Sequence, residues 1–131
     1  MKINMAILAN GAQVDNGLLN IGGGGWSHYS LPVFPGHVSG AIAGIVEVSD
    51  DERDIRSIIH VSARDAITKE ALGLEASIVL SGPPGDGPLE LPFAVPILFA
   101  VTEPTAVEFT VSSGGTKLTI LPLAVKLVGG E

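Results

Sequence analysis

The chain contains no cysteine, and its aromatic content is only 5%, with one tryptophan and one tyrosine. Without thiols, neither a disulfide framework nor a thiolate metal site can form. The few aromatic residues leave little material for an extended stacking surface. These absences exclude disulfide-stabilised domains and cysteine-ligated metal centres.

Basic residues are also scarce. The chain has 7 Lys and Arg against 14 Asp and Glu, which gives a formal net charge of −7, and the cations form no cluster. Such a chain is repelled by phosphate backbones and by anionic lipid headgroups. The sequence therefore predicts neither a nucleic-acid partner nor a membrane partner.

Charge of either sign is rare for a soluble chain. Charged residues make up 16% of the sequence, whereas about 25% is typical. Because so few charges are available to cover the outside, we expect part of the surface to be hidden in an interface. This predicts a protein partner, with a second copy of the chain in a homo-oligomer as the first candidate.

No hydrophobic run is long enough to span a membrane as a helix. The most apolar window, residues 91–102, contains Pro92 and Pro96 and falls short of the ~20 residues that a spanning helix needs. The first residues also lack the charged, apolar and small-residue segments of a signal peptide. We therefore predict a cytoplasmic protein.

Alternating apolar residues are the main structural pattern. Residues 2–9, 73–80 and 107–111 alternate with period 2, which is typical of half-buried strands. Residues 38–48 are almost entirely apolar and fit a central strand that is packed on both faces. About eight such segments predict an all-β fold, an antiparallel β-sandwich that is immunoglobulin-like or jelly-roll-like. We expect a single domain, residues 1–131.

Turn and breaker residues divide these segments. Asn10-Gly11 and Asp15-Asn16-Gly17 are predicted turns after the first strand. Residues 31–36 hold two prolines and predict an extended crossing segment, and Pro96 implies that its strand lies at an edge or contains a bulge. Ser113-Gly114-Gly115 predicts the turn of a closing hairpin.

Residues 50–66 fit two patterns. Ser49 to Glu52 has the composition of a capping box, and the isoleucines that follow also fit a helical spacing. The density of β-branched residues in 55–61 favours a strand. The following residues, 65–73, are then a turn or one short helix.

The stretch from Asn16 to Tyr29 is the most distinctive. Four glycines, Gly22–Gly25, immediately precede the only tryptophan. We interpret residues 18–29 as one strand with a bulge at the glycines and an aromatic anchor at Trp26. The residues that this places at an interface or a ligand site are Gly24, Gly25, Trp26, His28 and Tyr29.

Motifs for catalysis and metal binding are incomplete. The glycine run opens no helix and lacks the lysine of a phosphate loop. His28, His37 and His60 lack ligand spacing, and the acidic run 50–54 lacks the glycine and alternation of a calcium loop. Ser27 and His28 are adjacent, so on a strand they would point to opposite faces. We predict no enzyme, no cofactor and no metal.

Four segments follow one another in an order that is typical of one known family. They are AILANGAQVDNGLLNIGGGGWSHY, FPGHVSGAIAGIVEV, GPPGDGPLELPFAV and VEFTVSSGGTKLTILPLAV. On these motifs the chain resembles an uncharacterised family of small bacterial domains. It differs at Ser27, where the family often has an acidic residue, and at 105–107, where Gly-x-Tyr is common. The resemblance implies a β-sandwich and carries no activity.

The sequence therefore predicts a non-catalytic domain for protein interaction or assembly that self-associates. The alternative is a sandwich that binds a small ligand or a glycan through Trp26 and Tyr29. An exposed Trp26 would favour this alternative, and a buried one would count against it. An enzyme would require one of the three histidines to meet a carboxylate in a pocket.

Overall fold

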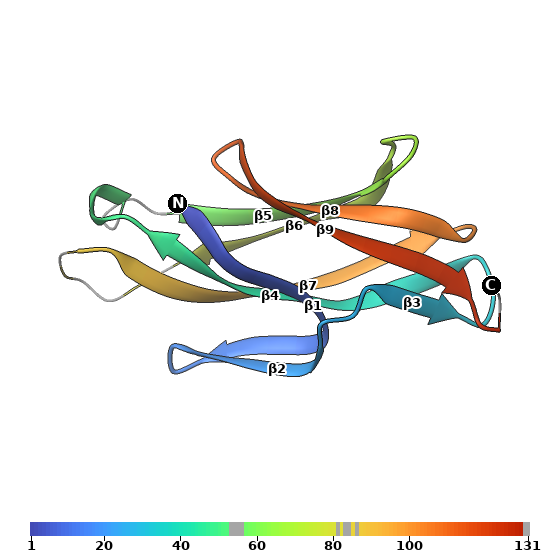
Figure 1. Ribbon diagram of the computed structural model, residues 1–131, viewed down its shortest axis with the longest axis horizontal. Coiled ribbons are helices and arrows are strands. Elements are labelled where there is room, and N and C mark those ends of the chain that lie inside the picture. Colours follow the sequence, from blue (N-terminus) through green and yellow to red (C-terminus); the bar gives the residue numbers. More distant parts are fainter. Residues whose placement is uncertain (53–56, 81, 83–84, 86, 130–131) are drawn as a thin grey trace.

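The alternating segments form strands that assemble into two stacked sheets (Figure 1). The computed structural model describes residues 1–52, 57–80, 82, 85 and 87–129. The first sheet has the strand order β2-β1-β4-β7, and the second has the order β3-β9-β8-β5-β6. The predicted β-sandwich is therefore confirmed. The elements are β1 (Lys2–Asp15), β2 (Leu18–Gly24), β3 (His28–Leu31), β4 (Gly36–Val48), the short 3-10 helix η1 (Asp50–Glu52), β5 (Ser57–Asp65), β6 (Ala71–Leu80), β7 (Leu89–Val101), β8 (Thr105–Ser113) and β9 (Thr116–Leu127).

The strand order is close to that of an immunoglobulin domain. The series β1-β4-β7 and β9-β8-β5-β6 reproduce the neighbour relations of strands A-B-E and G-F-C-C′ in that arrangement. One strand pair corrects the prediction of a purely antiparallel sandwich, because β3 runs parallel to β9. Of the two predicted arrangements, the order favours the immunoglobulin-like one.

Apolar side chains from both sheets meet in one core. Ile42 and Phe93 of the first sheet and Ile59 and Phe109 of the second are fully buried. Phe99 packs edge-on against Phe109, with 5.7 Å between the ring centroids. No polar or charged residue is buried in the part of the chain that the structure describes. Each buried aliphatic or phenylalanine side chain contributes about 1.5–3 kcal/mol, so apolar burial holds the sandwich together.

Several strands lie where their patterns predicted them. β4 lies between β1 and β7, so the apolar run 38–48 is a central strand. β7 lies at an edge of the first sheet, where Pro96 removes no hydrogen bond from a further strand. Residues 31–36 connect β3 of the second sheet to β4 of the first. β8 and β9 form the predicted hairpin around Gly114 and Gly115.

β5 confirms the strand prediction for the end of the contested stretch. Residues 53–56, which include Asp54 and Ile55, lie outside the described residues. Ser49 and Glu52 form one of the two reciprocal bonds of a capping box, in which the Ser49 N–H donates to Glu52 Oε1 at 3.0 Å. The Ser49 hydroxyl donates to the same oxygen at 2.6 Å. This box closes only the short helix η1, because β-branched residues soon return the chain to a strand.

Glu52 also contacts the start of β1. The α-ammonium group of Met1 donates to Oε1 and Oε2 of Glu52 at 2.8 and 2.9 Å. These hydrogen bonds, followed by those from Ser49, lower the pKa of Glu52 to about 2. The contact therefore joins the beginning of β1 to the connection that follows β4.

Two further loop predictions have different outcomes. The connection between β5 and β6 is a turn, so of the two alternatives predicted for residues 65–73 the turn is confirmed and the short helix is not. Lys69 has a φ of 65° in this turn, which a continuing helix does not allow. In the predicted loop at 82–88, residues 83, 84 and 86 lie outside the described residues.

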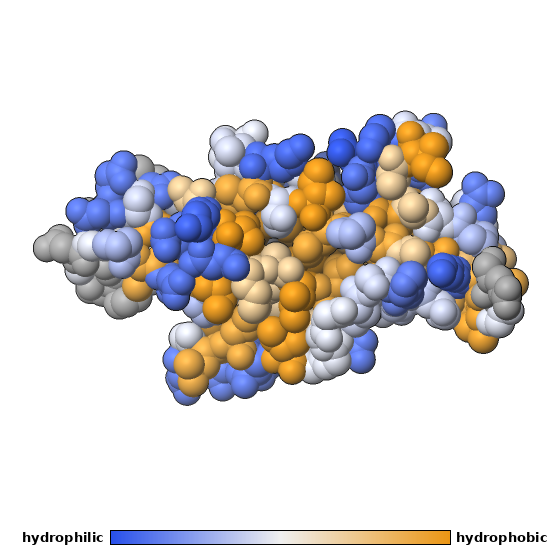
Figure 2. Space-filling view, in the orientation of Figure 1, coloured by the Kyte–Doolittle hydropathy of each residue, from blue (hydrophilic) through white to orange (hydrophobic). Residues whose placement is uncertain are grey.

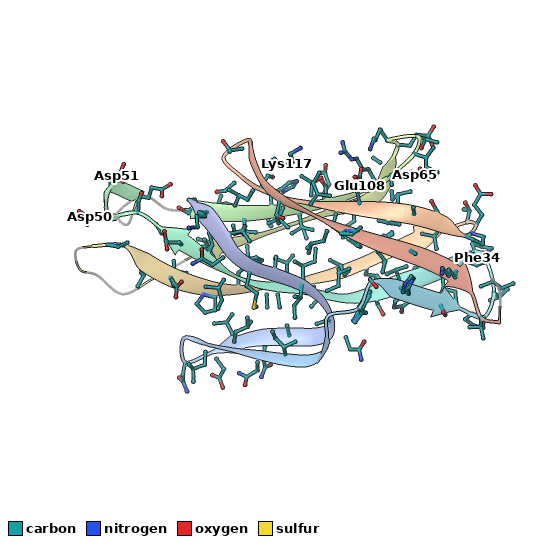
Figure 3. All side chains as sticks on the ribbon, viewed as in Figure 1. Phe34, Asp50, Asp51, Asp65, Glu108 and Lys117 are labelled. Atoms are coloured by element: carbon teal, nitrogen blue, oxygen red, sulfur yellow. The ribbon has the colours of Figure 1, made fainter. Side chains whose placement is uncertain are left out.

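Asp65 holds this turn and a neighbouring one together (Figure 3). Its Oδ1 accepts backbone hydrogen bonds from Ile67 at 2.8 Å and from Thr68 at 2.9 Å. Its Oδ2 accepts the hydroxyl of Thr105, at the start of β8, at 2.8 Å. The Thr68 N–H, with Thr105 and Ile67, lowers the pKa of Asp65 from the usual 3.8.

We predict that Asp65→Asn lowers the free energy of unfolding at about pH 7. We also predict that this free energy falls less between about pH 7 and about pH 3 in the variant than in the unmodified protein. Because the pKa of Asp65 is depressed in the folded state, its charge stabilises the fold above pH 3.8. This contribution is lost as the pH falls below that value. Urea denaturation at about pH 7 and about pH 3 measures the effect, with Asp15→Asn, at the exposed end of β1, as the control. An equal loss of stability in acid for both variants would contradict the assignment.

Candidate functional site

β1 folds back on itself, and the first sheet therefore carries a hairpin on its outer side. β1 pairs with β4 up to Ala9 and with β2 from Ala9 onward. Residues 10–24, here called the arm, comprise the second half of β1 and all of β2. In Figure 1 the arm lies beneath the first sheet, on the side away from the second sheet. The prediction that Asn10-Gly11 ends the first strand is wrong, because both residues lie within β1.

The strand registers show how far back the arm reaches. Ile7 pairs with Ala43 of β4, and Ala43 pairs with Ala94 of β7. Ala12 and Val14 of the arm nevertheless line one shallow hollow together with Ala94. After its last pairing with β4, the chain therefore folds back, and Ala12 and Val14 lie near the row of the sheet that contains Ile7, Ala43 and Ala94.

One face of the arm is apolar and packs against the first sheet. Since side chains alternate along a strand, the register pairs Ala12–Ile21 and Val14–Leu19 share this face. A Cβ atom at Gly24 would lie 2.8 Å from both Ile7 and Ile21, so these isoleucines meet at the glycine. The arm also contacts β4 and β7.

The first sheet is apolar on the side that receives the arm. Ala41 and Ala43 point away from the core, because they alternate with the buried Ile42. They are nevertheless only 3% and 0% exposed, and the arm accounts for this burial. The outer face of the first sheet comprises Met5, Ile7, Ala9, Ala41, Ala43, Ile45, Pro92, Ala94, Pro96 and Leu98.

The glycine run ends one strand and carries the chain to the other sheet. The Gly25 N–H donates to the carbonyl of Leu8 at 2.7 Å, and Ser27 accepts the N–H of Ala124 in β9 at 3.0 Å. Gly25 has a φ of 90°, which a residue with a side chain rarely adopts. The prediction of one bulged strand over residues 18–29 is therefore wrong. The chain switches sheets here, and the left-handed backbone of glycine permits the switch.

Trp26 fills the space at this crossing. A Cβ atom at Gly40 of β4 would lie 2.7 Å from Cζ2 of the indole ring, so the ring packs directly on the backbone of β4. Trp26 is partly exposed and packs against the core. Its Nε1 is buried and has no hydrogen-bond partner among the described residues. Trp26 therefore acts as a packing anchor between the sheets.

Tyr29 completes the aromatic cluster, whereas His28 does not join it. The Tyr29 and Trp26 rings lie 5.3 Å apart at an angle of 43°. The backbone N–H of Ser39 donates a long hydrogen bond of 3.4 Å to the Tyr29 hydroxyl. His28 is exposed and alternates with Tyr29 along β3, so it points to the opposite face. The structure thus brings Trp26 and Tyr29 together, whereas Gly24 and Gly25 contact β1 and His28 lies outside the cluster.

The three histidines lie apart on three strands. His28 is on β3, and His37 is exposed on β4 of the other sheet. His60 lies on β5, where its Nδ1 is 2.8 Å from the hydroxyl oxygen of Ser77. In residues 1–52, 57–80, 82, 85 and 87–129, no three His, Asp or Glu residues are close enough to hold a metal ion.

The arm and the part of β7 beside it carry exposed apolar surface that the sequence did not locate. Val14, Leu18 and Ile21 of the arm are 43%, 69% and 38% exposed, and Leu98 on β7 is 61% exposed. Figure 2 shows hydrophobic surface over the arm and over the middle of the molecule. The scarcity of charge indicated that such surface exists, but it did not indicate where.

We predict that Gly40→Ala destabilises the fold by about 1–3 kcal/mol, because the new methyl group would overlap the backbone carbonyl oxygen of Ala9 and the indole ring of Trp26. The displaced ring should also change its fluorescence. Urea denaturation followed by tryptophan emission measures both effects. Gly11→Ala is the matched control, since a Cβ atom there meets nothing within 4 Å. Equal stability of the two variants would contradict the packing that we describe.

The chain matches a described family but no characterised protein. No curated protein and no solved structure matches it. Among the described residues, no helix is long and apolar enough to cross a membrane. One family model matches residues 4–126, which is almost the entire sequence, and this match confirms the resemblance to an uncharacterised family. The chain belongs to DUF6941, a family of unknown function.

Proposed function

We propose that the protein is a non-catalytic assembly domain that associates with a second copy of itself through the outer face of the first sheet. The observation that carries this proposal is the apolar surface that the arm leaves open. Leu98 is 61% exposed, and Pro96 and Ala100 beside it on β7 are also exposed. An antiparallel sheet that faces water normally alternates apolar and polar residues, and this part of β7 does not.

The distribution of charge supports the choice of this face. Residues 36–46 of β4 and 91–101 of β7 contain no Asp, Glu, Lys or Arg. The second sheet carries its ion pairs outward instead, where Arg64 and Lys69 donate to Glu108 at 3.1 and 2.8 Å. Burial of the first sheet's outer face would therefore require no charged group to leave water, which keeps the cost of association low.

The net charge of −7 is compatible with self-association through this face. Two copies that meet through an uncharged patch keep their carboxylates in solvent, where salt screens the repulsion between them. A contact between two identical faces around a twofold axis is self-complementary, and it closes after two subunits. A second copy of the chain is therefore the proposed partner. The proposed location is the cytoplasm.

The alternative prediction, a glycan site at Trp26 and Tyr29, has less support. A sugar platform needs an aromatic ring with an open face. The Trp26 ring packs on Gly40 and beside Tyr29, and the Tyr29 hydroxyl accepts a bond from Ser39. We therefore do not extend the proposal to ligand binding.

We predict that Leu98→Asp converts the associated protein to single chains. The carboxylate would have to be buried in the contact without a partner, whereas in the single chain it remains in water. Because Leu98 is largely exposed, the free energy of unfolding of the single chain should change by at most about 0.5 kcal/mol. Light scattering across a dilution series, with Trp26 fluorescence followed in parallel, measures the mass and the dissociation.

Ile67→Asp is the matched control for charge and hydrophobicity. Ile67 is 83% exposed on the turn between β5 and β6, away from the first sheet. This variant should keep the mass of the unmodified protein. A single-chain mass for the unmodified protein at high concentration would overturn the proposal. Equal dissociation of both variants would exclude the outer face of the first sheet as the contact.

A further inference from the structure

We infer that the arm is exchanged between the two copies, so that residues 10–24 of each chain pack on the first sheet of the other. This inference rests on the proposed function, because it requires that two copies associate. It names the mechanism of that association and the segment that each copy contributes. Exchange of an identical element is a low-cost route to a symmetric dimer.

The arm is a hairpin whose two strands pair with each other. Its two strands pair with each other from Ala9–Gly24 to Asp15–Leu18. The backbone hydrogen bonds of the arm are therefore satisfied inside the hairpin. The arm can leave one sheet and reach another without exposing unpaired backbone groups.

The contacts between the arm and the first sheet are apolar. Ile7 meets Ile21 at Gly24, and Ala12 and Val14 line a hollow with β7 and with residues 78–80 of β6. Among the described residues, no side-chain hydrogen bond or ion pair joins the arm to β4 or β7. Apolar contacts do not depend on exact direction, so the identical face of a second copy receives the arm equally well.

Both segments that connect the arm to the rest of the chain contain glycine. The outgoing connection passes through Asn10-Gly11, and the returning one passes through Gly22 to Gly25. Gly23 and Gly25 already have φ values of 61° and 90°. Glycine changes backbone region at little steric cost, so these two connections can serve as a hinge.

When the arm is folded on its own sheet, apolar surface stays exposed on the arm and beside it. With the arm folded on its own sheet, Val14 and Ile21 remain partly exposed although they lie on its packing face. The open part of the outer face, at Pro96 and Leu98, begins beside the hinge, because Pro96 pairs with Ala41 and Ala41 pairs with Ala9. Two copies that exchange their arms and also stack through this face would enclose both arms and bury these residues.

The absence of cysteine makes a direct test possible. The double variant Val14→Cys, Ala94→Cys places one thiol on the arm and one on β7 in the same hollow. A short bis-maleimide joins thiols that are close together, and a denaturing gel then reports the mass of the product. We expect the product to have twice the mass of the chain, because the arm of one copy is joined to β7 of the other.

A second double variant controls for the chemistry. Ser62 and Thr110 pair directly between β5 and β8, so Ser62→Cys, Thr110→Cys should give a product with the mass of one chain. Ala12→Cys, Ala94→Cys is a second pair in the arm hollow, for use if the Val14 variant does not fold. Light scattering of the same samples establishes whether two copies associate at all.

The outcomes separate the inference from the proposed function. Association together with a product of doubled mass from the arm pair supports the exchange. Association with a single-chain product from both pairs overturns the exchange and leaves the proposed function standing. Single chains at every concentration overturn both.

Discussion

The structure depends on one strand, β4, that is covered on both faces. On its inner face, a Cβ atom at Gly44 would lie 2.6 Å from the ring of Phe93, so only glycine leaves room for this core residue. On its outer face, Ala41 and Ala43 are small enough for the arm to lie directly over them. A polar or bulky residue at any of these positions would separate the layers. The absence of charge from β4 up to Val46 is therefore a condition of the fold.

Much of the fold could be predicted because alternation is a local property. The all-apolar β4, the hairpin of β8 and β9 and the edge position of Pro96 all follow from neighbouring residues. Asn10-Gly11 signals a turn, but the pattern does not indicate that β1 continues through these residues and folds back on its own sheet. The residues on both sides of Asn10 fit a strand equally well, and the partner strand changes from β4 to β2 without a change in the pattern.

The candidate site shows the same limit. The glycine run and Trp26 were recognised as unusual, but a bulge and a change of sheet both require glycine. Only the pairing of β3 with β9 distinguishes the two. Leu98 illustrates a related difficulty. Its strand is apolar at both alternate sets of positions, which is typical of a strand buried on both faces, and the sequence does not indicate that the arm stops short of this residue.

The position of Pro96 at the edge of the first sheet affects whether the protein can form fibrils at high concentration. Pro92 and Pro96 both lie on the edge strand β7, and neither has an N–H to offer to an incoming strand. Growth by adding strands is how open sheets become fibrils. With this edge interrupted, the apolar surface of the first sheet can bring molecules together without also providing a template for amyloid there.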